Sequence, residues 1–197
     1  MWYWIFRAFF TIVIRLFFKF KVEGVENIPQ KTNFIVVANH ASFLDPLVVG
    51  VAIPRKIYWL AFREIYTMFW LKWFMKITET LPTGGSSEKA FYLLMKNRNV
   101  GLFPEGTRTY DGRLREFRRG AALLALKSGR PIVPCAILGT YEAFPRRAKF
   151  PKFLPIKVKV GKPMYLLKEF EEVIDDIKLQ EATFKIRSKI KEMIDAG

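Results

Sequence analysis

The 197-residue sequence predicts an α/β fold with a central, mostly parallel sheet flanked by helices. Three short runs of apolar and β-branched residues, 33–38, 100–103 and 132–138, have the composition of strands buried on both faces. Segments with helical patterns separate these runs along the chain. Because strands that alternate with helices form parallel sheets, we expect the active site at the carboxyl ends of the strands.

The first segment, residues 1–21, predicts an amphipathic helix that anchors the protein in the membrane interface. Its longest uncharged run, Ala8–Ile14, has only seven residues, which is too short to cross a bilayer. A polar stripe about 120° wide is formed in a helix by Arg7, Thr11, Arg15 and Lys19. The rest of the circumference is apolar, so the cations would meet lipid phosphates. The alternative is a helix packed on the protein's own core.

After the first strand, a proline and the spacing of aromatic residues indicate the next elements of the chain. Residues 46–52 favour a helix with Pro46 at its first position and Asp45 as its N-cap. Residues 56–60 indicate a short strand. Aromatic side chains then recur at three- and four-residue spacing over 58–77. This stripe fits a core-facing helix and a membrane-facing helix equally well.

The remaining elements follow in alternation. A Gly- and Ser-rich loop is predicted over 82–87. The later expected elements are a helix over 88–97, the strand 100–103, a helix over 117–128 closed by Gly129, the strand 132–138, a half-exposed strand over 156–160 and an amphipathic helix over 170–194.

The charge of the chain points to an anionic partner. The formal net charge is +15, although 51% of the residues are hydrophobic. Residues 145–162 carry seven basic groups and no acid. Such a balance suits a membrane surface or a nucleic acid. A nucleic-acid binder would not explain the cation-striped apolar segment at the start, so we expect a membrane and no nucleic acid.

Metal and disulfide chemistry are not expected. The chain has one histidine, one cysteine and no cluster of carboxylates with metal-ligand spacing. The single cysteine, Cys135, excludes a disulfide within the chain and reads as a small buried hydrophobe.

The single histidine, His40, precedes Asp45 by five residues. In an unbroken helix this offset would leave the side chains roughly 140° apart. Pro46 pushes Asp45 out of the helical region, so His40 would lie in the turn before the helix and could fold back toward Asp45. The pair would then be a base with its orienting carboxylate. The alternative is a surface histidine beside an ordinary cap.

A second group of polar residues follows the strand 100–103. Pro104 holds the preceding residue extended, and Gly106 permits an unusual backbone angle. The turn presents Glu105 and Arg108 beyond the strand end. Further arginines follow at positions 113, 115, 118 and 119. Guanidinium groups match phosphate oxygens, although a solvated arginine-rich loop is the alternative.

These residues carry a family resemblance. Asn39-His40 with Asp45 fits NHxxxxD, and Phe103–Arg108 reads FPEGTR. They resemble the first and third signatures of the glycerolipid acyltransferases, the 1-acylglycerol-3-phosphate acyltransferase family. Residues 132–134 resemble the fourth block, and the match runs from about residue 22 to 163. The region of the second block, 76–81, lacks the arginine with which that block usually ends.

The resemblance implies an acyltransferase domain over residues 22–197, with the glycerolipid acyltransferase fold. The implied reaction moves a fatty acyl group from acyl-CoA or acyl carrier protein to the sn-2 hydroxyl of 1-acylglycerol-3-phosphate (lysophosphatidic acid), giving phosphatidic acid. The donor is a co-substrate, and no cofactor is implied. Alternatives are a related acyltransferase acting on another lysolipid, or a non-catalytic protein of anionic membranes.

The resemblance also implies roles for single residues. His40 would be the catalytic base and Asp45 its orienting acid. Acceptor binding is implied for Glu105, Gly106, Thr107 and Arg108, with Arg63 as a further candidate. Backbone amides at Gly106 or near 132–134 could stabilise the oxyanion. We expect the protein to lie on the cytoplasmic face of a membrane.

Overall fold

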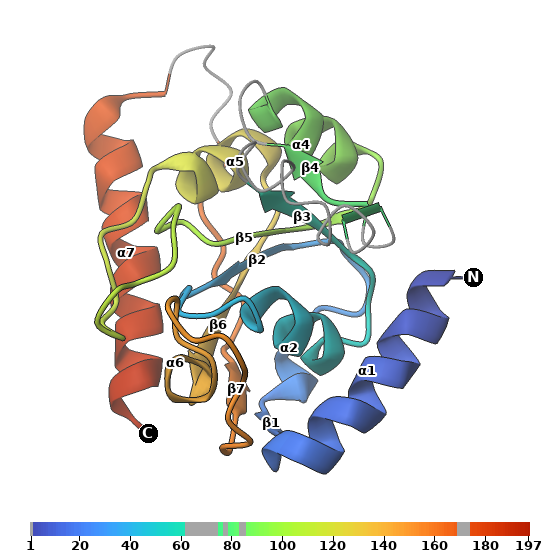
Figure 1. Cartoon of the computed structure of the whole chain (residues 1–197). Coiled ribbons are helices and arrows are strands. Elements are labelled where there is room, and N and C mark those ends of the chain that lie inside the picture. Colours follow the sequence, from blue (N-terminus) through green and yellow to red (C-terminus); the bar gives the residue numbers. More distant parts are fainter. Residues whose placement is uncertain (1, 62–74, 77–78, 83–85, 169–173) are drawn as a thin grey trace.

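One mixed sheet forms the centre of the computed structural model, which describes residues 2–61, 75–76, 79–82, 86–168 and 174–197 (Figure 1). Its strand order is β1-β7-β6-β2-β5-β3-β4. The strands are β1 (Lys21–Glu23), β2 (Ile35–Ala38), β3 (Ile57–Ala61), β4 (Leu81–Pro82), β5 (Asn99–Leu102), β6 (Ile132–Leu138) and β7 (Lys157–Val160). Neighbouring strands run parallel except β6 and β7. The predicted α/β fold with a mostly parallel sheet is confirmed.

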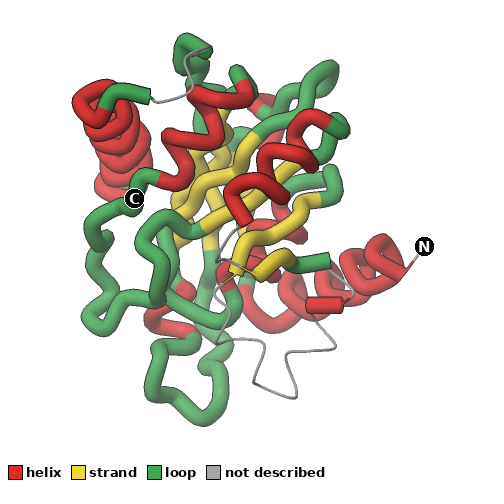
Figure 2. Tube along the Cα trace, turned by 90° about the horizontal axis from the view of Figure 1, so that it is seen from above, coloured by secondary structure: helices red, strands yellow, loops and turns green. Residues whose placement is uncertain are grey.

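Helices cover both faces of the sheet (Figures 1 and 2). On one face, α1 (Trp2–Phe18) and α2 (Asp45–Ala52) share a core with alternate residues of β2, β6 and β7. On the other face, α4 (Ser86–Met95), α5 (Gly120–Ser128) and α7 (Asp176–Asp195) pack on the remaining residues of β2. A short helix, α6 (Thr140–Ala143), follows β6.

The central strand β2 brings the two predicted groups of polar residues together. All four of its residues are buried, as the continuous apolar run predicts. Val37 is paired with Leu102 of β5 on one side and with Pro134 of β6 on the other. Since these strands are parallel, the residues that follow them leave the sheet at the same edge.

Several predicted boundaries differ from the structure. Of the helix predicted over 170–194, residues 170–173 lie outside the described residues, and α7 begins at Asp176, where Asp175 caps it by accepting a hydrogen bond from the Ile177 amide. Of the loop predicted over 82–87, Pro82 belongs to β4, which pairs with β3, Ser86 and Ser87 begin α4, and residues 83–85 lie outside the described part of the chain. In the aromatic stripe over 58–77, residues 58–61 belong to β3. Residues 62–74 and 77–78 lie outside the described part of the chain.

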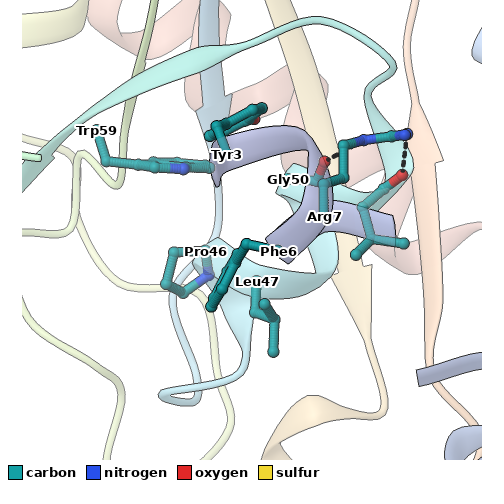
Figure 3. A pocket seen from close by; sticks show the side chains of 8 residues that line it. Tyr3, Phe6, Arg7, Pro46, Leu47, Gly50 and Trp59 are labelled. Carbon is teal, nitrogen blue, oxygen red and sulfur yellow. Dashed lines mark hydrogen bonds between the residues drawn. The ribbon is translucent and has the colours of Figure 1, made fainter. Parts of the chain in front are cut away.

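The first helix packs on α2 through the face that carries Arg7 (Figure 3). The Arg7 guanidinium donates to the carbonyl oxygens of Gly50 and Val51 at 3.1 and 2.8 Å. These carbonyls lie in the last turn of α2, where they have no partner within the helix. The polar stripe predicted that Arg7 would face lipid phosphates, and this is wrong for Arg7, which faces the protein. No helix in the described part of the chain is long and apolar enough to span a bilayer.

Burial of Cys135 on β6 leads to a test of the packed sheet. Cys135 is fully buried, and the loss of hydration raises the pKa of its thiol to about 12. The thiolate is the reactive form, so we expect a soluble disulfide reagent to react at least about 100-fold more slowly with the native protein than with the urea-unfolded protein. Spectrophotometric thiol titration in both states measures this ratio, and equal rates would contradict the buried position.

Candidate active site

His40 and Asp45 meet in the turn between β2 and α2. His40 Nδ1 lies 2.7 Å from Asp45 Oδ2, and the Asp45 side chain is fully buried. The same oxygen accepts hydrogen bonds from the backbone amides of Ala41 and Ser42 at 2.6 and 2.7 Å. A carboxylate oxygen can only accept from these groups, so Nδ1 donates to Asp45, and in the neutral ring Nε2 is the nitrogen that can accept a proton.

The helical role predicted for Asp45 is wrong. Asp45 is the first residue of α2 and not its N-cap, which is Leu44. Its side chain turns back to the amides of residues 41 and 42, which precede the helix. The broken helix that Pro46 implied is present, and it allows the contact with His40.

Asn39 fixes the position from which His40 leaves the sheet. Its side-chain Nδ2 donates to the Ile137 carbonyl at 2.9 Å, and its Oδ1 accepts from the Ile137 amide at 2.7 Å. These two bonds replace the strand pairing just beyond the end of β2. Sequence reasoning assigned Asn39 no role of its own, although its place between a buried strand and the only histidine was a signal.

Glu105 joins the second polar group to the first. Its Oε1 accepts from the His40 backbone amide at 2.6 Å, and its Oε2 accepts from the Arg115 amide at 2.9 Å. The residue is only 5% exposed. Burial raises the pKa of the Glu105 carboxyl, and the two amide bonds oppose this rise. Both oxygens are thus engaged within the protein, which indicates a positioning role for Glu105 more than contact with a substrate.

The rest of the predicted acceptor site forms a tight turn. Gly106 has a φ of +77°, and a Cβ there would lie 2.7 Å from Arg118 Nε. Its amide donates to the Phe103 carbonyl at 3.0 Å, so it is engaged within the turn and is not free for an oxyanion. Thr107 is exposed, and its hydroxyl is bonded to the Arg115 guanidinium.

The backbone amides near 132–134, the other oxyanion candidates, belong to the paired part of the sheet and not to the turn that contains His40. Residues 132–134 pair with residues 35–37 of β2, and the Ile132 amide donates to the Met164 carbonyl. They are therefore sheet residues, and position 137 of β6 is the one that lies beside the start of the His40 turn.

Aromatic rings pack on two residues of the site, His40 and Arg108. The Phe103 ring stacks on the His40 ring at 4.2 Å between centroids, and the Trp59 ring stacks behind it at 5.0 Å. The Arg108 guanidinium lies 3.4 Å above the centroid of Phe43. Arg108 is half-buried, and its Nη1 has no hydrogen-bond partner among the described residues.

His40 stands at one end of a cleft of about 520 Å³. The cleft continues past Thr109 and the segment 137–142 to the C-terminal half of α7. There it is lined by Arg187, Lys191 and Asp195, of which Lys191 is paired with Asp195 and Arg187 with Glu116. A cleft of this volume accommodates a ligand the size of a typical cofactor or drug.

Comparison with known proteins assigns the family. A family model described as Acyltransferase matches residues 19–138, more than half of the chain. The chain belongs to the acyltransferase family. The matched stretch contains both His40 and the 103–108 turn, as the two motifs had predicted.

Two relatives of this chain in the acyltransferase family carry the same activity in their names. The 1-acyl-sn-glycerol-3-phosphate acyltransferase LPAT1 of Arabidopsis thaliana is 30% identical over 195 residues, covering 94% of this chain and 52% of the relative. The 1-acyl-sn-glycerol-3-phosphate acyltransferase of Bacillus subtilis is 29% identical over 180 residues, covering 88% and 87%. The chain spans about half the length of the plant relatives that it matches.

A solved structure supports the fold of the acyltransferase. The crystal structure of the 1-acyl-sn-glycerophosphate (LPA) acyltransferase PlsC from Thermotoga maritima superposes with a TM-score of 0.79. It is 24% identical, and the match covers 97% of this chain and 79% of that one. The two chains therefore share the α/β architecture.

Two further predictions concern Arg63 and the absence of a metal site. Arg63 lies outside the described residues, so its role stays a prediction. In the described part of the chain, no three His, Cys, Asp or Glu side chains form a group that could hold a metal ion.

Substitution of Glu105 tests its positioning role. In Glu105→Gln the amide nitrogen must face one of two backbone N–H donors, so that donor loses its acceptor. We expect the free energy of unfolding to fall by about 1–3 kcal/mol. Activity should fall as well, because the His40 backbone loses an anchor. Urea unfolding and turnover measure the two effects. Glu181→Gln, at an exposed position of α7, is the matched control, and equal behaviour of both variants would contradict the role.

Proposed function

We propose that this chain is a 1-acylglycerol-3-phosphate O-acyltransferase, which transfers a fatty acyl group from a thioester to lysophosphatidic acid. The observation that carries the proposal is the His40–Asp45 contact of 2.7 Å at the mouth of the cleft. It supplies a base whose tautomer is fixed by a buried carboxylate. The names of the relatives support the acceptor.

In the proposed reaction His40 Nε2 takes the proton of the acceptor hydroxyl as its oxygen attacks the thioester carbonyl carbon. Asp45 holds the ring in place and stabilises the imidazolium that forms. The tetrahedral oxyanion then collapses, the carbon–sulfur bond breaks, and His40 returns the proton to the leaving thiolate. The products are an ester and a free thiol, and no acyl-enzyme is required.

The two substrates have separate places in this proposal. Arg108 binds the phosphate of the acceptor, since its guanidinium is half-buried near the catalytic turn and has an unpartnered Nη1. Arg63 is kept as a second candidate. The donor, acyl-CoA or acyl carrier protein, lies in the cleft, where its carrier would meet Arg187 and Lys191 in competition with their partners Glu116 and Asp195. Another lysolipid acceptor remains the alternative within this family.

The exposed side of α1 supports the proposed attachment of residues 1–21 to a membrane surface. A ridge at three- and four-residue spacing is formed by Ile5, Phe9, Ile12 and Leu16, which are 54%, 59%, 68% and 73% exposed. Together these four residues are called the α1 ridge. A soluble protein rarely leaves such a continuous apolar surface in water, whereas a lipid interface accommodates it.

A loop after α6 extends the same surface. Phe153 contacts Phe17 at 5.0 Å and Phe18 at 5.6 Å between ring centroids, and Phe150 is 80% exposed. Lys149 and Lys152 are exposed beside these rings. We keep the cytoplasmic face as the proposed location, because its anionic lipids attract such a cationic border. A non-catalytic membrane protein would need this surface but not the His40–Asp45 pair.

The catalytic proposal is tested by acyl transfer. We expect the wild-type protein to acylate lysophosphatidic acid in a panel of lysolipids offered with acyl-CoA and with acyl carrier protein. In His40→Ala the rate should fall about 100- to 10,000-fold, because the general base is lost. Thermal unfolding and vesicle binding should stay at wild-type values. Turnover retained in His40→Ala would contradict the mechanism, and vesicle binding without any transfer would favour the non-catalytic alternative.

The membrane proposal is tested by a charge on the α1 ridge. Phe9→Glu should lower partition into anionic vesicles about tenfold or more, because an apolar contact is lost and a buried charge is added. Sedimentation with vesicles measures the partition. Phe184→Glu is the matched control, since Phe184 is 67% exposed on α7, on the other face of the sheet. An equal loss in both variants would contradict a specific contact through α1.

A further inference from the structure

The loop that follows α6 is fixed against the catalytic turn. Ser42 Oγ, three residues before Asp45, donates to the Phe144 carbonyl at 2.8 Å. The rings of Phe43 and Phe144 lie 6.4 Å apart between centroids. Arg146, two residues further along this loop, is therefore held near the turn that contains His40, although no sequence motif includes it.

A second set of contacts ties Arg146 to the 103–108 turn. Its guanidinium lies 4.4 Å from the ring centroid of Tyr110. The Tyr141 hydroxyl, on α6, donates to the Tyr110 carbonyl at 2.9 Å, so the two segments are also joined through the backbone. Arg108 stacks on Phe43, the residue that contacts the Arg146 loop. Each guanidinium thus rests on an aromatic ring in the same small region.

The charge of Arg108 is partly balanced by the Asp45 carboxylate, which opposes the lowering of the Arg108 pKa. Neither Arg108 nor Arg146 forms an ion pair in the described part of the chain. Burial, and after it the repulsion from Arg146, lower the pKa of the Arg108 guanidinium. Burial and the repulsion between the two cations disfavour the charged form of Arg108, and an anion bound to both guanidinium groups would offset that effect.

We infer that Arg146 is the second arm of the acceptor-phosphate site, and that Arg108 and Arg146 together select a phosphomonoester dianion over lysolipids with a phosphodiester headgroup. The inference rests on the proposed function and names which acceptors the site prefers. A phosphomonoester carries close to two negative charges at neutral pH and three acceptor oxygens. Two guanidinium groups match that charge and those oxygens, whereas a phosphodiester has one charge and fewer free oxygens.

The same arginine could contact lipid headgroups of the membrane, since Phe150 and Phe153 follow it in the loop. The two sources of phosphate give different results. A membrane contact would change vesicle binding and leave the kinetics in neutral detergent micelles unaltered. A substrate contact would change the KM for lysophosphatidic acid in those micelles and leave vesicle binding unaltered.

Arg146→Gln is the variant that tests the inference, and Arg147→Gln is its matched control. Arg146 and Arg147 are both exposed, and in the part of the chain that the structure describes Arg147 has no hydrogen bond, ion pair or ring contact. We expect Arg146→Gln to raise the KM for lysophosphatidic acid in neutral micelles about 10- to 100-fold, with kcat within about twofold, because a charge-assisted contact is lost. Arg146→Lys should recover part of this loss, and Arg147→Gln should behave as wild type.

The pH dependence separates a charge contact from a structural effect. The second proton of a phosphomonoester binds with a pKa of about 6. The ratio of wild-type to Arg146→Gln kcat/KM should therefore shrink as the pH falls from about 7.5 to about 5.5. A ratio that does not change with pH would overturn the selection of a dianion.

Titration of the protein with sn-glycerol 3-phosphate measures binding of the headgroup without turnover. It therefore tells a failure of the inference apart from a failure of the proposed function. Wild-type protein and Arg147→Gln should bind this headgroup, and Arg146→Gln should bind it at least about tenfold more weakly. This result would support the site even without turnover. If the wild-type protein acylates lysophosphatidic acid while Arg146→Gln keeps the wild-type KM and binding, the inference fails and the function stands.

Discussion

The site depends on the hydrogen bonds that the buried carboxylate of Asp45 accepts. Its side chain is fully buried, and three N–H groups point at one of its oxygens. A buried charge is tolerated only when such donors compensate the lost water. The amides of Ala41 and Ser42 must therefore turn inward, which ends β2 and delays the start of α2. The bend that places the imidazole beside Asp45 is thus imposed by the solvation of one carboxylate.

A second buried carboxylate extends this constraint to β5. Glu105 accepts from the His40 amide and from the Arg115 amide, so hydrogen bonds join the turn after β2 to the segment after β5. Asn39 makes the equivalent connection to β6. The imidazole is consequently positioned from three strands, while its Nε2 edge remains open to the cleft. In this arrangement polar side chains form hydrogen bonds with backbone groups around His40, and such supporting bonds hold a reactive residue in one position.

The sequence predicted the parts of this site that follow from local chemistry. A continuous apolar run predicts a buried strand, and a proline after Asp45 predicts a helix start, because both rules depend on neighbouring residues only. The roles of Glu105 and Asn39 depend on which strands are neighbours, and a single sequence does not state the strand order. Arg7 illustrates the same limit. Helical spacing placed it on a polar stripe, but the carbonyl groups that it binds belong to α2, more than 40 residues away.

The positions of Arg146 and the α1 ridge suggest how the fold connects the catalytic turn to a lipid surface. The loop that carries Arg146 is held to the catalytic turn by Ser42, and further along it Phe153 packs on the end of α1. One segment thus connects the arginine pair to the apolar surface. A lysolipid that keeps its acyl chain at that surface would bring its phosphate to the arginine pair and its hydroxyl toward His40. The donor, in contrast, would approach from the cleft that runs to α7, so the two substrates would meet at the imidazole from different sides.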